Sequence, residues 1–293
     1  MVCVLRGLGT FERVFFKMKI IEPTGLEVAM AGPFGKGYNI SARSPNVEVK
    51  AGDEIIQQYL RRYEQCLNQS WDYGYSIGLP PWPKLDDLDP LSVPQINLWL
   101  QLTSQYENEG NYCQNTGAFL GWIVQRSYNA GMNSCTLDCG GIKPLHNMII
   151  GAKEERVLEL NVQGRVGDHV LANSCHIRAQ VEECGDYFLN GARHVTATVD
   201  TVGNMLGSQG FYDDVINFIQ WEAEDLEVTI RKNAGKSVFT GVKNSILISP
   251  NLSLCEKTRK EMRHDKNTTS DIFYLRPDGT RELYYPLERK RLR

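Results

Sequence analysis

The sequence predicts a mainly β protein: a right-handed parallel β-helix, or solenoid, built from 18-residue coils, with an α+β amino-terminal region. The first observation is a glycine that returns with an 18-residue period, at Gly167, Gly185 and Gly203. The second is that apolar residues occupy alternate positions of segments 177–181 (IRAQV) and 195–199 (VTATV), which is the period of a β-strand. Self-similarity at a fixed short period indicates stacked repeats rather than one closed core.

The three blocks that begin with these glycines also agree at other positions. Two apolar residues follow each glycine, at Val170–Leu171, at Phe188–Leu189 and, with a slip of one residue, at Met205–Leu206. Segment 158–162 precedes segment 177–181 by a 19-residue step and has the same alternation, which predicts an earlier coil. The glycines are expected at corners, where the backbone needs a positive φ or a close approach to the next coil.

The third block is interrupted. Asp213 stands where an apolar residue is expected, and the apolar residues of segment 211–219 have helical spacing. We therefore expect a helical insertion at about 211–222. The strand pattern resumes at Val228–Ile230 and recurs at Ile246–Ile248, which restores the 18-residue period.

Three regions are expected along the chain. Residues 1–112 form the α+β amino-terminal region, which includes a stiff proline-rich connector at 73–94. Residues 113–250 form the solenoid. Residues 251–293 form a charged segment and a carboxy-terminal hairpin, whose turn is the Pro-Asp-Gly sequence at 277–279.

The amino-terminal region should contain short strands followed by two helices. The first 50 residues alternate apolar runs with turn sequences, which is typical of short strands. Apolar residues recur at helical spacing from Asp53, which suits an N-cap, to about Gln69, and a second helix should end near Glu107. The aromatic residues of segment 71–82 are expected to cap the open end of the solenoid or, alternatively, to form a docking surface.

Composition bounds the class of partner and the compartment. The 293 residues are 42% hydrophobic and 23% charged, which is ordinary for a globular protein. A net charge of −3 gives no general attraction to nucleic acid or to an anionic membrane, and no apolar run is long enough to span a bilayer. The first residues do not resemble a signal peptide, so the eight cysteines are expected to be reduced thiols of a cytoplasmic protein.

A few residues could carry chemistry. Cys135, Cys139 and His146 are candidate metal ligands because zinc sites use Cys and His at short spacing. No second pair has matching spacing, so buried thiols are the favoured interpretation, and whether the three bind metal stays open. His176 and His194 share the 18-residue period and should stack on neighbouring coils, either as a proton-responsive or metal-binding strip or as equivalent positions of one exposed face.

Two other patterns are weaker. Residues 234–237 (AGKS) look like the end of a phosphate-binding loop, but Ile230 stands where that motif needs its first glycine. A left-handed hexapeptide β-helix also has 18-residue coils, but it needs an aliphatic residue at every sixth position. The series from Val166 is broken by Arg178 and Asn190.

The repeat is similar to the glycine-patterned β-solenoid of the GXGXG type. That solenoid forms the carboxy-terminal domain of the glutamate synthase large subunit and one of the subunits of formylmethanofuran dehydrogenase, and small proteins carry it alone. The resemblance covers residues 115–210 and, more weakly, 226–250. Residues 116–129 look like the lead-in segment of the stand-alone proteins.

The family pattern is G-x-x-x-G followed by a small pair, usually Gly-Gly. Gly203 and Gly207 keep the spacing, whereas Leu171 and Leu189 stand where the second glycine would be. The resemblance implies a diverged stand-alone member. It also implies a structural role, because the domain has no catalytic residues of its own in the characterised relatives.

These observations lead to a functional expectation. We expect a non-catalytic, cytoplasmic scaffold that binds a protein partner or a second copy of itself, and that binds neither nucleic acid nor membrane. No catalytic, cofactor-binding or metal-binding residue is assigned, and no cofactor is expected. The alternative is a subunit or relative of a glutamate synthase-type or formylmethanofuran dehydrogenase-type oxidoreductase.

Overall fold

The computed structural model describes residues 2–4, 13–15, 54–67, 87–207, 223–262 and 269–285. The chain divides into two compact units, Met1–Gln57 and Gln58–Arg293, and each is described by itself. In the first unit, strand β1 (Val2–Val4) pairs antiparallel with strand β2 (Arg13–Phe15), as expected for short strands near the amino terminus. The other strands expected before residue 50 lie outside the described residues.

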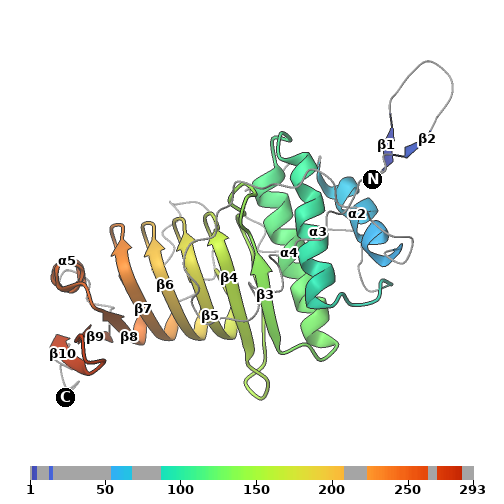
Figure 1. Cartoon of the computed structure of the whole chain (residues 1–293). Helices are drawn as coiled ribbons and strands as arrows, with labels where there is room; N and C mark the ends of the chain where they lie inside the picture. The colour runs from blue at the N-terminus through green and yellow to red at the C-terminus, as the bar shows by residue number, and fades with distance from the viewer. Residues whose placement is uncertain are drawn as a thin grey trace, which may run out of the picture. The chain divides into compact units, whose positions relative to one another are not determined.

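The second unit is a parallel β-solenoid, which confirms the predicted fold class (Figure 1). Seven strands pair in parallel and in chain order, and an eighth, β10, pairs antiparallel with β9. The strands are β3 (Ser134–Asp138), β4 (Leu158–Arg165), β5 (Cys175–Cys184), β6 (Arg193–Val202), β7 (Glu224–Ala234), β8 (Lys243–Ser249), β9 (Thr269–Leu275) and β10 (Arg281–Tyr285). The helices are α2 (Glu54–Leu67), α3 (Val93–Thr103), α4 (Tyr112–Asn129) and α5 (Leu252–Met262), with a short 3₁₀ turn at Ser104–Tyr106.

The strand register follows the predicted alternation. Ala179 of β5 pairs with Ala197 of β6, and the apolar residues on either side pair in the same way, so that all of them point into the core. Leu158 pairs with Ile177, which confirms the earlier coil and its 19-residue spacing. The expected 18-residue recurrence into β8 is wrong, because Val228 pairs with Leu247, a 19-residue step.

The repeated glycines serve one of the two purposes expected of them. Gly167, Gly185 and Gly203 are absent from the positive-φ glycines of the described residues, so the need for a positive φ was wrong. Close approach is the reason: a Cβ on Gly185 would overlap Asp168 Oδ1 and would lie 2.8 Å from the carbonyl carbon of Gly167. Gly235 has the same environment against Gly203 and is a fourth member of the series.

Positive φ angles occur instead in the segment that follows each corner, residues 169–173 in the first coil. We call this segment the wall of the coil. His169, Leu171 and Asn173 have φ of 56°, 56° and 53°, and the equivalent residues of the next coils repeat the alternation. The His169 N–H donates to Asp186 O of the next coil (2.9 Å), whereas the Leu171 N–H donates to Met148 O of the previous one (2.7 Å). The alternation therefore hydrogen-bonds each coil to both of its neighbours.

In this segment the third block aligns with the first without the one-residue slip that was expected. Leu206 is three residues after Gly203, as Val170 is after Gly167, and it is fully buried. Gly207 then takes the next position, with a φ of 63°. Met205 is equivalent to His169, and its N–H donates to Lys236 O.

An insertion interrupts the stack without shifting its register. Ala197 pairs with Val228, a 31-residue step in place of the 18-residue one, and the same step holds from Arg193 to Val199, after which a bulge in β7 adds one residue. Residues 208–222 stand where the coil of Gly185 has only Asn190 and Gly191. The predicted insertion is thus confirmed, while its expected helical conformation lies outside the described residues.

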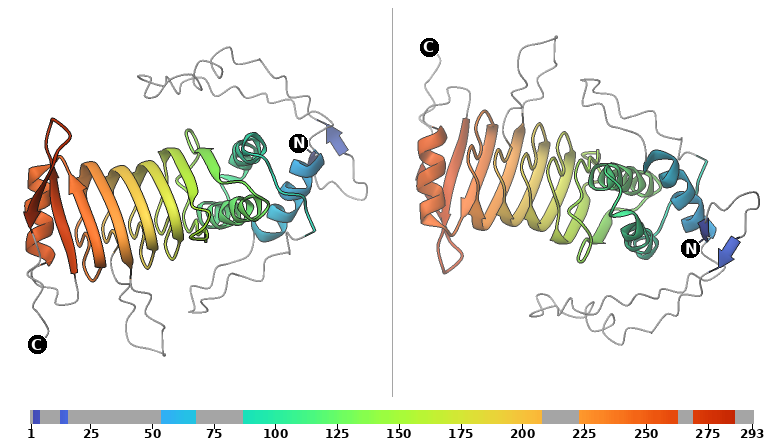
Figure 2. Two further views of the ribbon diagram at one scale, coloured as in Figure 1. Left: turned by 90° about the horizontal axis from the view of Figure 1, so that it is seen from below. Right: turned by 90° about the horizontal axis from the view of Figure 1, so that it is seen from above.

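Helices α3 and α4 close the end of the stack beside β3 (Figure 2). Residues 113–129, expected to belong to the solenoid, lie in α4 instead, and the sheet begins at Ser134. The segment at residues 146–149 packs closely against this helix at Gly117 and Gly121. A larger residue would not fit there, because a Cβ on Gly121 would lie 2.8 Å from Ile149 O. The Asn97 side chain of α3 meets the free edge of β3: it donates to Thr136 O (2.7 Å) and accepts from the Asp138 N–H (2.8 Å).

Strands β9 and β10 with helix α5 form the other end of the stack. The charged segment after residue 250 begins as α5, and the predicted hairpin is confirmed, since the Gly279 N–H donates to Arg276 O at its turn. The parallel sheet does not stop at residue 250 as expected, because β9 pairs with β8. Lys257 of α5 donates to Ala234 O (3.3 Å) and to Gly235 O, so it satisfies carbonyls of the last corner.

We predict that Gly185→Ala destabilises the protein by about 1–3 kcal/mol, because the added methyl group would push two coils apart. Gly110→Ala is the matched control, since a Cβ there meets nothing within 4 Å, and it should change stability by less than about 0.5 kcal/mol. Urea unfolding measures both. Equal effects of the two substitutions would contradict the close-approach role.

We predict that replacing residues 208–222 by Asn-Gly, a copy of Asn190–Gly191, leaves the stack folded. The residues on both sides already hydrogen-bond to the previous coil, Gly207 to Phe188 O (2.9 Å) and Glu224 to Ala192 O (3.1 Å). Circular dichroism and thermal unfolding of the shortened chain test this. A loss of cooperative unfolding would show that the stack depends on the insertion.

Candidate functional site

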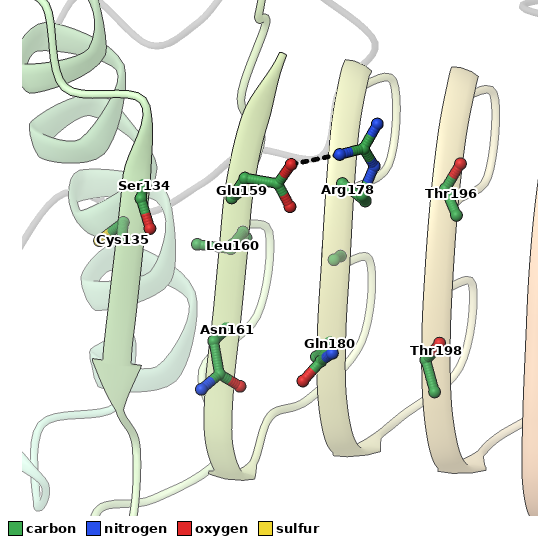
Figure 3. A pocket seen from close by; sticks show the side chains of 10 residues that line it. Ser134, Cys135, Glu159, Leu160, Asn161, Arg178, Gln180, Thr196 and Thr198 are labelled. Carbon is green, nitrogen blue, oxygen red and sulfur yellow. Dashed lines mark hydrogen bonds and ion pairs between the residues drawn. The ribbon is translucent and has the colours of Figure 1, made fainter. Parts of the chain in front are cut away.

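The outer face of the parallel sheet is the candidate site. Inward positions of β4 to β6 are apolar and buried, while the outward positions between them are polar. Because the strands are in register, these outward side chains align across the sheet (Figure 3). Ser134, Glu159, Arg178 and Thr196 form one row, and Asn161, Gln180 and Thr198 form a second row. We call these seven residues the outer face.

The outer face holds a shallow depression of about 340 Å³. Arg178 Nη1 donates to Glu159 Oε1 at 2.5 Å, and both side chains remain about half exposed or more (61% and 48%). An exposed ion pair of this kind contributes about 1 kcal/mol or less, so it can exchange partners at little cost. With the amides of Asn161 and Gln180 beside it, the depression offers donors and acceptors to a polar partner.

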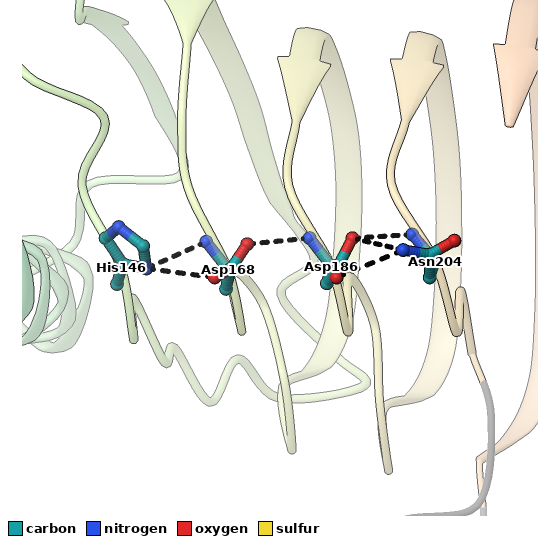
Figure 4. A network of polar contacts seen from close by, with 4 residues as sticks. All are labelled: His146, Asp168, Asp186 and Asn204. Atoms are coloured by element: carbon teal, nitrogen blue, oxygen red, sulfur yellow. Dashed lines mark hydrogen bonds and ion pairs between the residues drawn. The ribbon is translucent and has the colours of Figure 1, made fainter. Parts of the chain in front are cut away.

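A ladder of polar side chains runs along the corner of the stack (Figure 4). The residue after each corner glycine accepts a hydrogen bond from the backbone N–H of its equivalent on the next coil. Asp186 N–H donates to Asp168 Oδ1 (2.8 Å), and Asn204 N–H donates to Asp186 Oδ1 (2.7 Å). His146 begins the ladder, because its Nδ1 accepts from the Asp168 N–H (3.1 Å). These bonds join coils, and they account for His146 without a metal.

The histidine ladder expected from the sequence is present. The rings of His176 and His194 stack with centroids 4.8 Å apart, and His194 Nδ1 lies 3.2 Å from Asp225 Oδ2 of the next coil. Each of these residues, and Asn244 after them, has a φ near 50°. His, Asp and Asn are the side-chain types most often found in that left-handed region. The backbone conformation therefore explains this column of residues, and it favours the interpretation as equivalent surface positions.

The structure does not bring the proposed metal ligands together. Cys135 lies on β3 and Cys139 directly after it. Their Cα atoms are therefore separated by four steps of extended chain, about 13 Å. That distance exceeds what one tetrahedral zinc ion can bridge. Within the described ranges, no three His, Cys, Asp or Glu side chains are placed to hold a metal ion.

Seven of the cysteines are free thiols in the described part of the chain, and burial disfavours the thiolate form of each. Burial raises the pKa of Cys135 and of Cys139 to about 12, and it raises the pKa of Cys255 to about 11. Cys113 and Cys175 are half-buried, and burial also raises the pKa of each. These thiols pack as small apolar side chains, in agreement with the favoured interpretation.

Two other sequence features remain, the residues that look like the end of a phosphate-binding loop and the aromatic segment. The loop-like residues 234–237 form a corner of the solenoid, where Gly235 packs on Gly203 and Lys236 N–H donates to Asn204 Oδ1 (2.8 Å). They follow strand β7, but they do not open a helix as a phosphate-binding loop does. The aromatic segment 71–82 lies outside the described residues, as does most of the connector at 73–94.

Sequence reasoning missed the outer face, although its signal was present. The residues between the apolar positions of β4 to β6 are polar, which is the ordinary mark of a sheet exposed on one side. Their alignment into rows depends on register, and the 19-residue step between β4 and β5 hides it from a search at period 18.

Comparison with known proteins adds no relative: no protein-family model, curated protein or solved structure matches the chain. In the part of the chain that the structure describes, no helix combines the length and the apolar character needed to cross a bilayer.

We predict two classes of thiol in the folded protein. Cys113 and Cys175 should react with iodoacetamide at pH 8, while Cys66, Cys135, Cys139, Cys184 and Cys255 should react only after unfolding, because they are buried and their thiolates are disfavoured. Mass spectrometry of alkylated peptides, with and without urea, measures this. Rapid native labelling of Cys135 or Cys139 would contradict the packing described here.

Proposed function

We propose that the protein is a non-catalytic scaffold that binds a protein partner through the outer face. The observation that carries this proposal is the alignment of seven polar side chains across four strands of a rigid sheet. Solenoids present extended surfaces of this kind to their partners because each coil repeats the position of the last. The same proposal places the chain in the cytoplasm, where free thiols are the rule.

The chemistry of the outer face supports binding rather than turnover. Its side chains are a carboxylate, a guanidinium, amides and hydroxyls, and the carboxylate and guanidinium already neutralise each other. A partner that supplies a chain of polar groups can replace these contacts one for one. The alternative, a subunit of a glutamate synthase-type or formylmethanofuran dehydrogenase-type oxidoreductase, rests on the glycine-patterned resemblance.

We predict that Thr198→Arg abolishes partner binding without unfolding the protein, because it places a long charged side chain in the depression. Gln101→Arg, on an exposed position of α3, is the matched control and should bind normally. Tagged full-length chain carrying a photo-crosslinker at residue 180 identifies the bound protein, and binding of that purified protein is then measured for each variant.

The outcomes separate the hypotheses. Loss of binding in Thr198→Arg alone supports the scaffold. Equal binding by both variants, or no crosslinked protein at residue 180, contradicts it. A complex that contains flavin or an iron–sulfur cluster would favour the oxidoreductase subunit.

A further inference from the structure

The two edges of the parallel sheet differ. At the β3 edge, the Asn97 side chain occupies backbone groups that another strand would need, the carbonyl of Thr136 and the N–H of Asp138. At the other edge, β10 is the last strand, and within the described part of the chain no strand pairs with its outer side. An unpaired edge strand is a template for another β-strand.

The residues of this edge are accessible. Arg281, Glu282 and Leu283 are exposed, and Leu283 has 47% of its surface free. Leu252 at the start of α5 is the other large exposed apolar side chain of the described residues. Tyr284 is half-buried, and its hydroxyl donates to Glu256 Oε2 of α5 (2.6 Å), which holds the strand against the end of the stack.

We propose that β10 pairs antiparallel with β10 of a second copy of this chain, across a twofold axis at Leu283. This inference goes beyond the proposed partner site on the outer face and does not depend on it. The main-chain groups of two exposed edges then satisfy each other, and the leucine of one copy packs on the leucine of the other.

The charges of the strand disfavour two of the alternative registers. A twofold axis at Arg281 would place two guanidinium groups opposite each other, and an axis at Glu282 would place two carboxylates opposite each other. An axis at Leu283 instead places Glu282 opposite Tyr284 of the partner, so that the two Glu282 carboxylates are diagonal neighbours, about 7–8 Å apart, rather than directly opposite each other. Arg281 and Glu282 also stay neutralised within their own chain, by Glu227 (2.7 Å) and by Arg276 (2.8 Å).

The same arrangement limits the assembly to two copies. An isologous pair uses the β10 edge of both chains, so that none remains for a third. The opposite edge is occupied by Asn97 and cannot extend the sheet. The product is a closed dimer with one continuous sheet rather than a fibre.

The test is the oligomeric state of the full chain, measured by light scattering after size-exclusion chromatography over a range of concentrations. The wild-type chain should be a dimer at high concentration. Leu283→Lys and Leu283→Glu should each be monomeric, because each places two like charges opposite each other. An equimolar mixture of the two variants should again be a dimer, because lysine then faces glutamate.

Leu252→Lys is the control, since it changes the other exposed leucine and should leave the dimer intact. Circular dichroism confirms that each variant is folded. A monomeric wild type, dimeric single variants, or a mixture that stays monomeric would each overturn the proposal. A wild type that stays monomeric but takes up a strand from a different protein would overturn it in favour of another occupant.

Discussion

Contact between successive backbones at the glycine corners is the constraint on which the rest of the structure depends. At these corners a hydrogen atom is all that fits between one coil and the next, as Gly185 and Gly203 show. The close approach brings carboxylate and amide oxygens of one coil to the N–H groups of the next, which builds the corner ladder. It also allows the alternating wall to donate hydrogen bonds in both directions. Strand register, core rows and outer face all follow from this stacking.

The sequence predicted those features that depend on local periodicity. Alternation alone was enough to place β5 and β6, because each inward residue is apolar and each outward one is polar. Gly235 escaped notice because the insertion at 208–222 moves it out of phase with Gly203. The left-handed conformation of Leu171 and Leu189 could not be foreseen, since leucine rarely adopts it and only the stacked neighbours enforce it.

The candidate site shows a similar division. That the outward residues are polar can be read from the chain, but the meeting of Glu159 and Arg178 depends on a 19-residue step that only the folded register reveals. The contact of Asn97 with β3 joins residues 39 and 41 positions apart, and no local pattern announces it. The histidines were predicted to stack because they share the 18-residue period, yet their backbone angles gave the reason for their presence.

The insertion between Gly207 and Ala223 has a consequence for how this chain can vary. Both of its anchors are held by the previous coil, so the distance that the segment must bridge is set by the stack and not by its own length. The entropic free-energy cost of closing such a loop grows only with the logarithm of its length, by about 0.6 kcal/mol for each doubling. The solenoid can therefore accept inserted segments of different length between Gly207 and Ala223 without a change in the coils on either side.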